Sequence, residues 1–428
     1  MVGKVKLPVR KSLVKRQKNF LELRGRPHIG CGVDSSAIRR PKKVNHVRKV
    51  KVGCGERLTE LTLAAGSVYT STVVWFWRHV RRQGVWLSQY GMQKRLNNGQ
   101  PSILHSQSAQ KAVECFFHAL KTWRVERKTN PTIRAPYKLK RFYKVVWKKE
   151  AIRLRDGKLK LSNAKGTEPL VFDWPHEKPV QVEMGWDGSQ YELRATYETE
   201  VDADPGQDVA SCDLGEVHPA VVGTSDFCLI LNGGELRAKR RYREKLKGEM
   251  GAKIDRKKSG SKRRRRLALS KRKKLEKLNN QILDIEHKLT TAAINTLAKR
   301  GVGTLAIGDL RDIRVDYDKG KGQNQRMHQA PTGVVRRYLT YKAKRLGWLV
   351  ELVNEAWTSQ ECPQCEARTK PKDRRYKCAS CGFEAHRDAV GQVNILRKYL
   401  GNDRDSRVVG AMASPIGVRY VPQLRCRS

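Results

Sequence analysis

The chain has 428 residues, of which 89 are Lys or Arg and 42 are Asp or Glu, so its formal net charge is +47. Such a surplus attracts polyanions, nucleic acid first, while nine Trp and 39% hydrophobic residues exclude a purely basic tail. The longest apolar stretch, residues 68–77, is too short and too polar to span a bilayer, so we expect no membrane partner.

The first half of the chain predicts a β segment, a helical segment and a second β segment. Residues 1–55 are basic, with Gly and Pro punctuation, and are expected to form strands and loops, whereas residues 56–127 carry apolar residues at helical spacing. Residues 138–201 alternate as strands do, the Asp-Gly pairs in RDGK and WDGS suit tight hairpins, and residues 202–207 are expected to be a linker. A small antiparallel β-barrel or sheet is the expected product.

After residue 206 the pattern predicts alternating strands and helices. Two strands around a turn are expected over residues 209–236, and a long helix with an apolar stripe follows the basic run and ends near Arg300, with Gly301 as its C-cap. TLAIGDL reads as a buried strand, and a helix, a strand and a last helix over residues 385–400 follow. This alternation indicates an α/β domain. Residues 401–428 carry little pattern, and we expect a tail without order there.

Four of the ten cysteines form a tight array, CPQC, twelve intervening residues, then CASC. Two such knuckles match a tetrahedral zinc site, and the short loop between them fits a zinc ribbon over residues 357–384, with chance spacing or an iron site as the alternatives. We predict one structural Zn²⁺, held by Cys362, Cys365, Cys378 and Cys381. The other cysteines are scattered and are expected to be reduced thiols, which, with an N-terminus that lacks the apolar core of a signal peptide, predicts a cytoplasmic protein.

Two acidic residues lie at positions where a bound metal ion could neutralise their charge. Asp213, in ASCDLGE, lies on an apolar strand, where a carboxylate is costly unless a cation pairs with it. Asp388, in AHRDAVGQVNI, falls in the first turn of a helix, where it could instead stabilise the helix N-terminus. Chemistry on a nucleic-acid backbone calls for such carboxylates, because Mg²⁺ prefers hard oxygen ligands.

Five segments carry a resemblance to a known family: CDLGEVHPAVV, KKSGSKRRRRLALSKRKKL, TLAIGDL, EAWTSQECPQC and YKCASCGFEAHRDAVGQVNIL. In these segments and their order the sequence resembles the TnpB proteins of bacterial insertion sequences, relatives of compact type V CRISPR effectors and of the eukaryotic Fanzor proteins. The resemblance implies an RNA-guided DNA endonuclease of the bacterial cytosol or nucleoid, with guide RNA and target DNA as partners.

The resemblance also implies a multidomain α/β plus β architecture. Residues 207–356 and 385–400 would form an RNase H-like RuvC nuclease domain, with the zinc ribbon at 357–384 inserted before its last helix. Residues 1–55 and 136–206 would form the β-barrel wedge domain that grips guide RNA, and residues 56–135 the helical recognition lobe.

The same resemblance makes Asp213 the first RuvC acid and Asp388 the third. The family strand that matches TLAIGDL commonly ends Glu-Asp-Leu, whereas this chain has Gly308 before Asp309. In a subset of TnpB-like and Fanzor-like proteins the second acid lies on the strand before the TS-x-x-C knuckle, where Glu355 stands. We therefore predict Asp213, Glu355 and Asp388 as the catalytic ligands of two Mg²⁺ or Mn²⁺ ions that cleave phosphodiesters, with Asp309 as a substitute ligand or a dead site as alternatives.

Nucleic-acid contacts are predicted from the basic run at residues 257–266 and from the segment before the third acid. His386 is a further candidate contact to the scissile phosphate, a polar helix start being its alternative. Three other functions stay open: a compact CRISPR effector, a guided binder that represses without cutting, and a plain zinc-ribbon nucleic-acid-binding protein. The predicted nucleic-acid-binding residues are Lys257, Lys258, Lys262, Arg263, Arg264, Arg265, Arg266 and Arg387.

Overall fold

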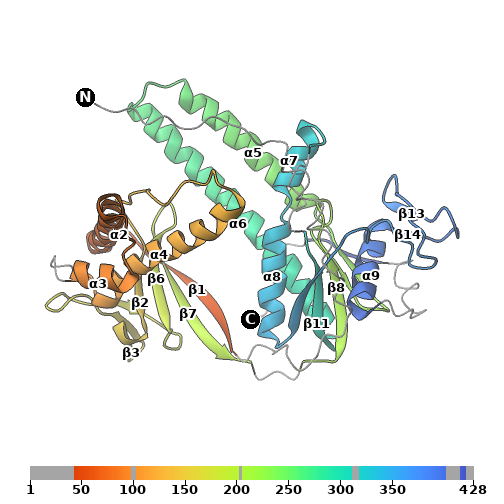
Figure 1. Cartoon of the computed structure of the whole chain (residues 1–428), viewed down its shortest axis with the longest axis horizontal. Coiled ribbons are helices and arrows are strands. Elements are labelled where there is room, and N and C mark those ends of the chain that lie inside the picture. The colour runs from red at the N-terminus through yellow and green to blue at the C-terminus, as the bar shows by residue number, and fades with distance from the viewer. Residues whose placement is uncertain (1–42, 98–102, 202–204, 311–317, 402–414, 421–428) are drawn as a thin grey trace.

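The computed structural model describes residues 43–97, 103–201, 205–310, 318–401 and 415–420, which form two parts that lie side by side (Figure 1). One part holds two small sheets and a helical layer, and the other a larger sheet between helices. A long helix, α6 (Lys262–Ala298), runs from one toward the other. Within the described ranges no helix has the length and apolar character of a membrane span.

The first part contains a four-stranded antiparallel sheet with the order β1-β7-β6-β2 and a three-stranded sheet with the order β3-β4-β5. Alternation of side chains along β4 buries Leu159 and Leu161 and leaves Lys158 and Lys160 exposed, as the sequence predicts for a half-buried strand. In the turn between β3 and β4, Asp156 and Gly157 adopt φ values of 51° and 66°, which confirms the predicted hairpin. The strands are β1 (Lys43–Gly53), β2 (Val145–Lys148), β3 (Ile152–Arg155), β4 (Lys158–Leu161), β5 (Leu170–Asp173), β6 (Gln181–Trp186) and β7 (Tyr191–Glu200).

Three helices cover this β region, as predicted for residues 56–127: α2 (Glu56–Gln83), α3 (Gln89–Asn97) and α4 (Ser106–Thr129). Their apolar faces meet in an aromatic core in which Phe76 and Phe116 pack edge to face with a centroid distance of 5.2 Å. The expected strand of the N-terminal segment is β1, which pairs with β7 although more than a hundred residues separate them. Residues 1–42 of that segment lie outside the described residues.

The second part is built on a six-stranded sheet with the order β12-β11-β8-β9-β10-β15. Strand β9 is antiparallel to β8 and β10, whereas β11 is parallel to β8, and β12 to β11. The prediction of two strands over residues 209–236 is wrong, because three short strands fold back on one another there. The strands are β8 (Asp208–Asp213), β9 (Val221–Gly223), β10 (Cys228–Leu231), β11 (Val302–Gly308), β12 (Leu349–Val353) and β15 (Ile416–Val418).

The tail prediction is wrong for residues 416–418, since β15 pairs in parallel with β10. The remaining predictions for the C-terminal elements hold. Strand β11 is buried along its whole length, and helices α8 (Thr332–Arg345) and α9 (Arg387–Leu400) follow where they are expected. Helix α6 ends two residues earlier than predicted, and Gly301 then adopts a φ of 72°.

Helices cover both faces of the large sheet. Ala210 and Cys212 of β8 pack with α6 and α8, whereas Ser211 of the same strand bonds to α9 on the opposite face. The two-residue period of a strand therefore turns Asp213 and Gly308 toward α9, since Cys212 and Ile307 belong to the other core.

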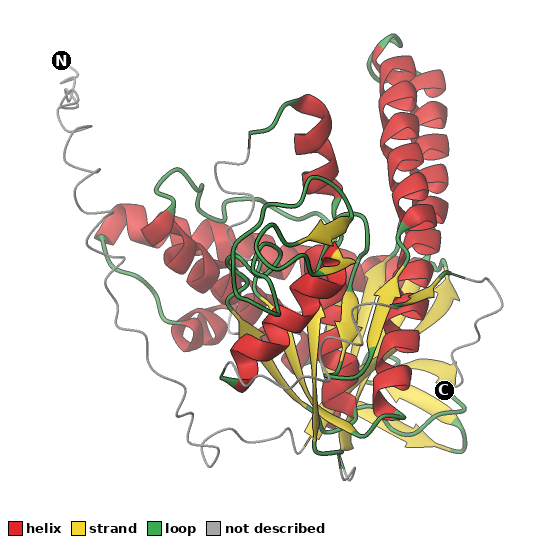
Figure 2. Ribbon diagram, turned by 90° about the vertical axis from the view of Figure 1, so that its right-hand side faces the viewer, coloured by secondary structure: helices red, strands yellow, loops and turns green. Residues whose placement is uncertain are grey.

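Helix α5 (Gly234–Asp255) and the first half of α6 form a hairpin that projects from the sheet (Figure 2). The basic run at residues 257–266 forms the tip of this hairpin and the first turn of α6. The remaining elements are short: α7 (Lys321–Gln329), the 3-10 turn η1 (Lys149–Ala151), and the antiparallel pair β13 (Arg375–Lys377) and β14 (Glu384–His386).

Candidate functional site

Two of the predicted acids, Asp213 and Glu355, lie at the carboxyl ends of the mutually parallel strands β8, β11 and β12. Asp213 is the last residue of β8, Gly308 ends β11, and Glu355 lies two residues beyond β12. Parallel pairing places Gly308 beside Val353 and Ile307 beside Cys212, so the three strand ends lie at one edge of the sheet. Ligand sites in α/β sheets commonly form at this edge.

Glu355 fills the space above the glycine that replaces the expected acid. A Cβ atom at position 308 would lie 2.5 Å from the Glu355 Oε2 atom and 3.0 Å from Ile395 Cδ1. Asp309 instead forms an ion pair of 3.4 Å with Arg336 of α8. The carboxylate next to the end of β11 therefore comes from Glu355, which follows β12, and not from a residue of β11 itself.

Helix α9 closes over Asp213 at a glycine. A Cβ atom at Gly391 would lie 2.5 Å from Asp213 Oδ2, a separation that real side chains do not adopt. The fully buried Gln392 fixes the helix, because its Nε2 donates to Ser211 Oγ at 2.7 Å and to the Gly223 carbonyl at 3.1 Å. Gly391 thus lets the helix approach the sheet with Asp213 between them.

Asp388, in the first turn of α9, has partners that the sequence did not predict. Arg374 Nη1 donates to both carboxylate oxygens, at 2.8 and 2.6 Å, and His218 Nε2 lies 3.7 Å from Oδ2. His386 caps the helix by accepting a hydrogen bond from the Asp388 backbone N–H at 3.3 Å, so the polar-helix-start role is observed for it.

His218, His386 and Asp388 place one ligand atom each within 4.8 Å of one another. Asp213, Glu355 and Asp388 do not form such a group among the described residues, since Asp388 is turned to Arg374. His218 follows Asp213 by five residues, which is a detectable signal for a residue of this site. Arg374 lies between the two knuckles and has no distinguishing signal.

The acids of the site are held in an environment that disfavours their charges. Burial raises the pKa of Asp213 well above its usual range, and the charges of Glu355 and Asp388 raise it further. Burial also raises the pKa of Glu355 to about 7, with Asp309 adding to the effect and Lys398 opposing it. Glu355 Oε2 is buried and has no hydrogen-bond partner. A bound cation would relieve both conditions, so the residues fit a hard divalent ion such as Mg²⁺.

The four predicted cysteines form a second group, with sulfur atoms within 4.8 Å of one another. Cys362 and Cys381 are 3.6 Å apart, and Cys365 and Cys378 are 3.5 Å apart, as sulfur atoms. Four thiolates at about 2.3 Å from one tetrahedral Zn²⁺ are separated by roughly 3.8 Å. The cluster therefore fits a zinc site, and the backbone N–H groups after each knuckle bond back to its first cysteine.

The basic run lies at the tip of the hairpin, where Lys257 and Arg264 are half-buried and the other basic residues are exposed. Arg264 Nη1 donates to the carbonyls of Ile254 and Lys257, and its Nη2 pairs with Asp255, so this arginine closes the tip. Ser261 caps α6 by accepting from the Arg264 N–H. Arg387 is half-buried beside Asp388, whereas these residues of the run face solvent: Lys258, Lys262, Arg263, Arg265 and Arg266.

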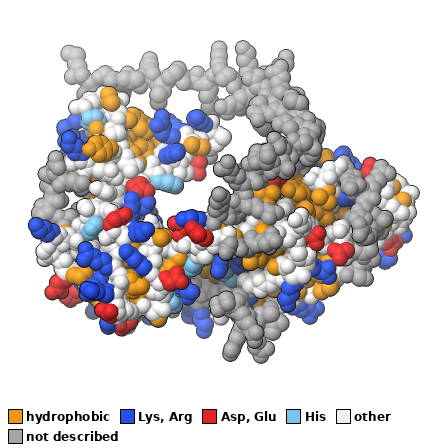
Figure 3. Space-filling model, turned by 90° about the horizontal axis from the view of Figure 1, so that it is seen from below, with side chains coloured by type: hydrophobic (Ala, Val, Ile, Leu, Met, Phe, Trp, Pro, Cys, Tyr) orange, Lys and Arg blue, Asp and Glu red, His pale blue; other side chains and the backbone are white. Residues whose placement is uncertain are grey.

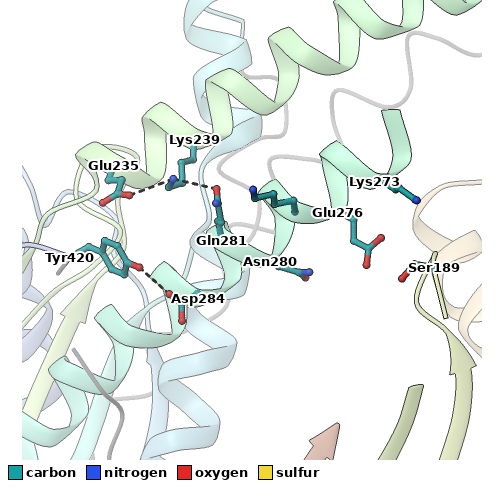
Figure 4. Close-up of a pocket in the computed structure, with 10 residues that line it drawn as sticks. Ser189, Glu235, Lys239, Lys273, Glu276, Asn280, Gln281, Asp284 and Tyr420 are labelled. Carbon is teal, nitrogen blue, oxygen red and sulfur yellow. Dashed lines mark hydrogen bonds and ion pairs between the residues drawn. The ribbon is translucent and has the colours of Figure 1, made fainter. Parts of the chain in front are cut away.

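Positive charge is not confined to the hairpin. Lys and Arg side chains are spread over both parts of the face seen in Figure 3, with acidic side chains scattered among them. A cavity of about 760 Å³ lies where α5 and α6 approach the turn at Ser189 (Figure 4). Lys239 pairs there with Glu235 at 3.6 Å, and Tyr420 donates to Asp284 at 2.9 Å. The residues that line this cavity include none of the predicted acidic ligands and none of the four cysteines.

Two segments of the chain match known protein-family models. Residues 333–395 match a family model described as "Cas12f1-like, TNB domain", and residues 192–314 match one described as "Probable transposase". The protein MJ0856.1 of Methanocaldococcus jannaschii is 33% identical over 85 residues, which are 18% of this chain and 78% of that protein. The TnpB-like protein ORF457 of Acidianus two-tailed virus is 27% identical over 256 residues. The chain belongs to the TnpB family.

The match to ORF457 covers 57% of this TnpB protein and 55% of the viral protein, so the chain spans about half the length of that relative. A solved Cas12f1, in complex with an sgRNA and target DNA, shares the fold with a TM-score of 0.55. Its sequence identity is 11%, over 79% of this TnpB chain and 82% of that one. The family thus ties the chain to the ancestry of RNA-guided nucleases.

Proposed function

We propose that the chain is an RNA-guided DNA endonuclease that hydrolyses phosphodiesters at Asp213, Glu355 and Asp388. The observation that carries the proposal is the Glu355 carboxylate above Gly308, 2.5 Å from where a Cβ atom at 308 would lie. A carboxylate at the end of the second central strand is thereby kept, although the residue of that strand is glycine. Asp309, paired with Arg336, is the weaker candidate.

The strand order supports an RNase H-like RuvC domain. Three antiparallel strands, β10-β9-β8, continue into two parallel ones, β11 and β12, with acids at the ends of the central strands. On this proposal the residues around the cysteine cluster form a zinc ribbon with one structural Zn²⁺, and the two smaller sheets belong to the wedge domain. The helices α2, α3 and α4 form the recognition lobe.

Asp213, Glu355 and Asp388 would hold two Mg²⁺ or Mn²⁺ ions, which when bound activate water and stabilise the leaving 3′ oxygen. The chain's own residues prepare the site. Glu355 and Asp213, whose pKa values are raised, must release protons to become ligands. Asp388 must exchange its bond with Arg374 for a ligand role, which frees the guanidinium to contact a phosphate.

Guide RNA and target DNA are the proposed partners. The exposed basic residues at the hairpin tip grip backbones, while base pairing with the guide reads the sequence. A nuclease-inactive, guided repressor is the second candidate, because Asp388 pairs with Arg374 and the three acids do not gather as one ligand group.

The decisive experiment moves the acid back to its usual strand. Protein purified with its own guide RNA is tested for target cleavage in Mg²⁺ as four forms: parent, Glu355→Ala, Asp309→Ala, and Glu355→Ala combined with Gly308→Glu. We expect Glu355→Ala to lower cleavage by more than about 100-fold, since a direct metal ligand outweighs a supporting residue. Asp309→Ala should retain most activity, and the double variant should recover part of it.

Guide and target binding by each form supplies the control. If the parent binds both and never cuts, the nuclease proposal fails and the repressor takes its place. If Asp309→Ala abolishes cleavage and Glu355→Ala does not, the second acid is Asp309 and the relocation is wrong.

A further inference from the structure

Trp357, two residues after Glu355, has an unusual backbone and an unusual exposure. Its φ is 67°, in the left-handed region that glycine favours, and 53% of the residue is exposed. Holding a bulky residue in this backbone conformation is energetically costly, and such strain gathers at functional sites. Burial cannot account for the indole, because a core position would hide it.

The turn that carries Trp357 is fixed by helix α9. Asn394 Nδ2 donates to the carbonyls of Thr358 and Glu361 at 2.7 and 2.8 Å, and Lys398 Nζ donates to the Ala356 carbonyl at 2.5 Å. These bonds hold the backbone on both sides of Trp357 while its side chain points away from the core. The position of the indole is therefore set by the same helix that carries Asp388.

A cationic side chain, that of Arg368, lies next to the Trp357 ring. The Arg368 guanidinium lies over the indole, with Cζ 4.8 Å from the ring centroid. An exposed aromatic face next to a guanidinium suits a nucleobase and its phosphate, because bases stack on aromatic rings whatever their sequence and Arg adds charge. Protein partners use aromatic anchors too, but the chain's net charge of +47 favours a polyanionic one.

We infer that Trp357, supported by Arg368, is a stacking platform for one base of the strand being cut, next to the scissile phosphate. The inference rests on the proposed function, since Thr358, the next residue, bonds to the Glu355 carbonyl and ties the platform to the proposed ligand. Trp357 is a positioning residue: it orients the nucleotide and takes no part in proton or metal chemistry.

Abasic nucleotides test the platform through cleavage. Guide-loaded parent is assayed in Mg²⁺ on targets that carry one abasic site at each position around the cut. We expect one position at which the lesion slows the parent roughly 10- to 100-fold, the range of one lost base stack. Trp357→Ala should be slowed by a similar factor on the intact target and be insensitive to that lesion, while Trp357→Phe retains part of the effect.

Two control variants separate stacking from folding. Trp357→Gly relieves the positive φ, so it should melt no earlier than the parent yet show the same loss as Trp357→Ala. Ile416→Ala removes an apolar side chain of similar exposure, 54%, from β15 and should leave the lesion profile unchanged. If the Trp357 variants lose thermal stability or zinc and still respond to the lesion as the parent does, the residue is structural and the inference is wrong.

A second measurement does not require cleavage. Single-stranded target DNA with 5-iodouracil near the cut position is bound to guide-loaded parent without Mg²⁺ and irradiated, and the cross-linked peptide is identified by mass spectrometry. A cross-link at Trp357 supports the platform even if the parent never cuts, in which case only the nuclease proposal fails. Cross-links elsewhere, with none at Trp357, overturn the platform.

Discussion

Glu355 is a largely buried carboxyl whose Oε2 atom has no hydrogen-bond partner, which makes its effect on stability in the metal-free protein depend on pH. Burial raises its pKa to about 7 from an ordinary value of 4.5. A carboxyl whose pKa is raised on folding stabilises the fold below pH 4.5 and loses that contribution as the pH rises through 7. In EDTA at about pH 8, Glu355→Gln should therefore be more stable than the parent by about 1–2 kcal/mol, a figure reduced for partial exposure.

Urea unfolding of both proteins at several pH values measures this difference. The gap between the two should close below about pH 4, where Glu355 is protonated in both the folded and the unfolded state. Millimolar Mg²⁺ should reverse the order at about pH 8, because the parent alone binds the ion fully. A variant that is less stable than the parent in EDTA at every pH would mean that the carboxylate has a partner other than a metal.

A substitution of Gly391 should affect the stability of the protein and its cleavage activity differently. Its replacement by Ala should raise helix stability by roughly 0.5–1 kcal/mol, but the new Cβ would meet Asp213 Oδ2 at 2.5 Å and turn that carboxylate away. We expect Gly391→Ala to melt no earlier than the parent and to lose most cleavage. Gly248→Ala in α5, where nothing lies within 4 Å, is the matched helix glycine and should keep full activity. Equal activity in both variants would show that Asp213 need not keep its position.

At the scale of elements, the basic residues of the hairpin tip have two expected roles. The exposed ones bind nucleic acid, and Arg264 stabilises the fold of the tip. The triple change of Arg263, Arg265 and Arg266 to Ala removes exposed charges and should lower the slope of log K against log salt by up to about 3 for double-stranded DNA. Arg264→Ala should instead lower the melting temperature and leave the slope near the parent's, because Arg264 bonds the carbonyls that close the hairpin. Equal salt slopes in parent and triple variant would exclude the tip from the interface.

Elements with a long local pattern could be predicted from the sequence, and short ones could not. The stripe of α6 and the buried run of β11 carry their own periodicity, so their positions follow from nearby residues. Strands β9 and β15 have three residues each, and β15 pairs with β10 across almost two hundred residues. Only the assembled sheet defines such strands.

The site was predictable to the same extent. Cysteine spacing and the family resemblance predicted the candidate ligand residues, because both are read along the chain. The bond from Arg374 to Asp388 depends on how the β13–β14 pair folds against α9, and the strained backbone of Trp357 on bonds from Asn394 and Lys398. Contacts between distant segments leave no local pattern in the sequence.

At the scale of the whole molecule, the large net positive charge lowers the stability of the free protein. A net charge of +47 repels itself in the free protein, and salt screens that repulsion over a Debye length of about 10 Å at 0.1 M. The melting temperature of the free protein should therefore rise as NaCl increases from a few tens to a few hundred millimolar. The guide-RNA complex should behave in the opposite way, since salt weakens the contacts between basic side chains and phosphates.

Thermal melts of free and RNA-bound protein over the same salt series test both expectations. A sucrose series of matched osmolality controls for solvent effects that do not depend on charge, and it should not separate the two forms. If salt lowers the melting temperature of the free protein, its ion pairs outweigh its net repulsion, and the surplus is balanced within the fold. If salt raises both temperatures alike, the RNA does not neutralise the charge that destabilises the free chain.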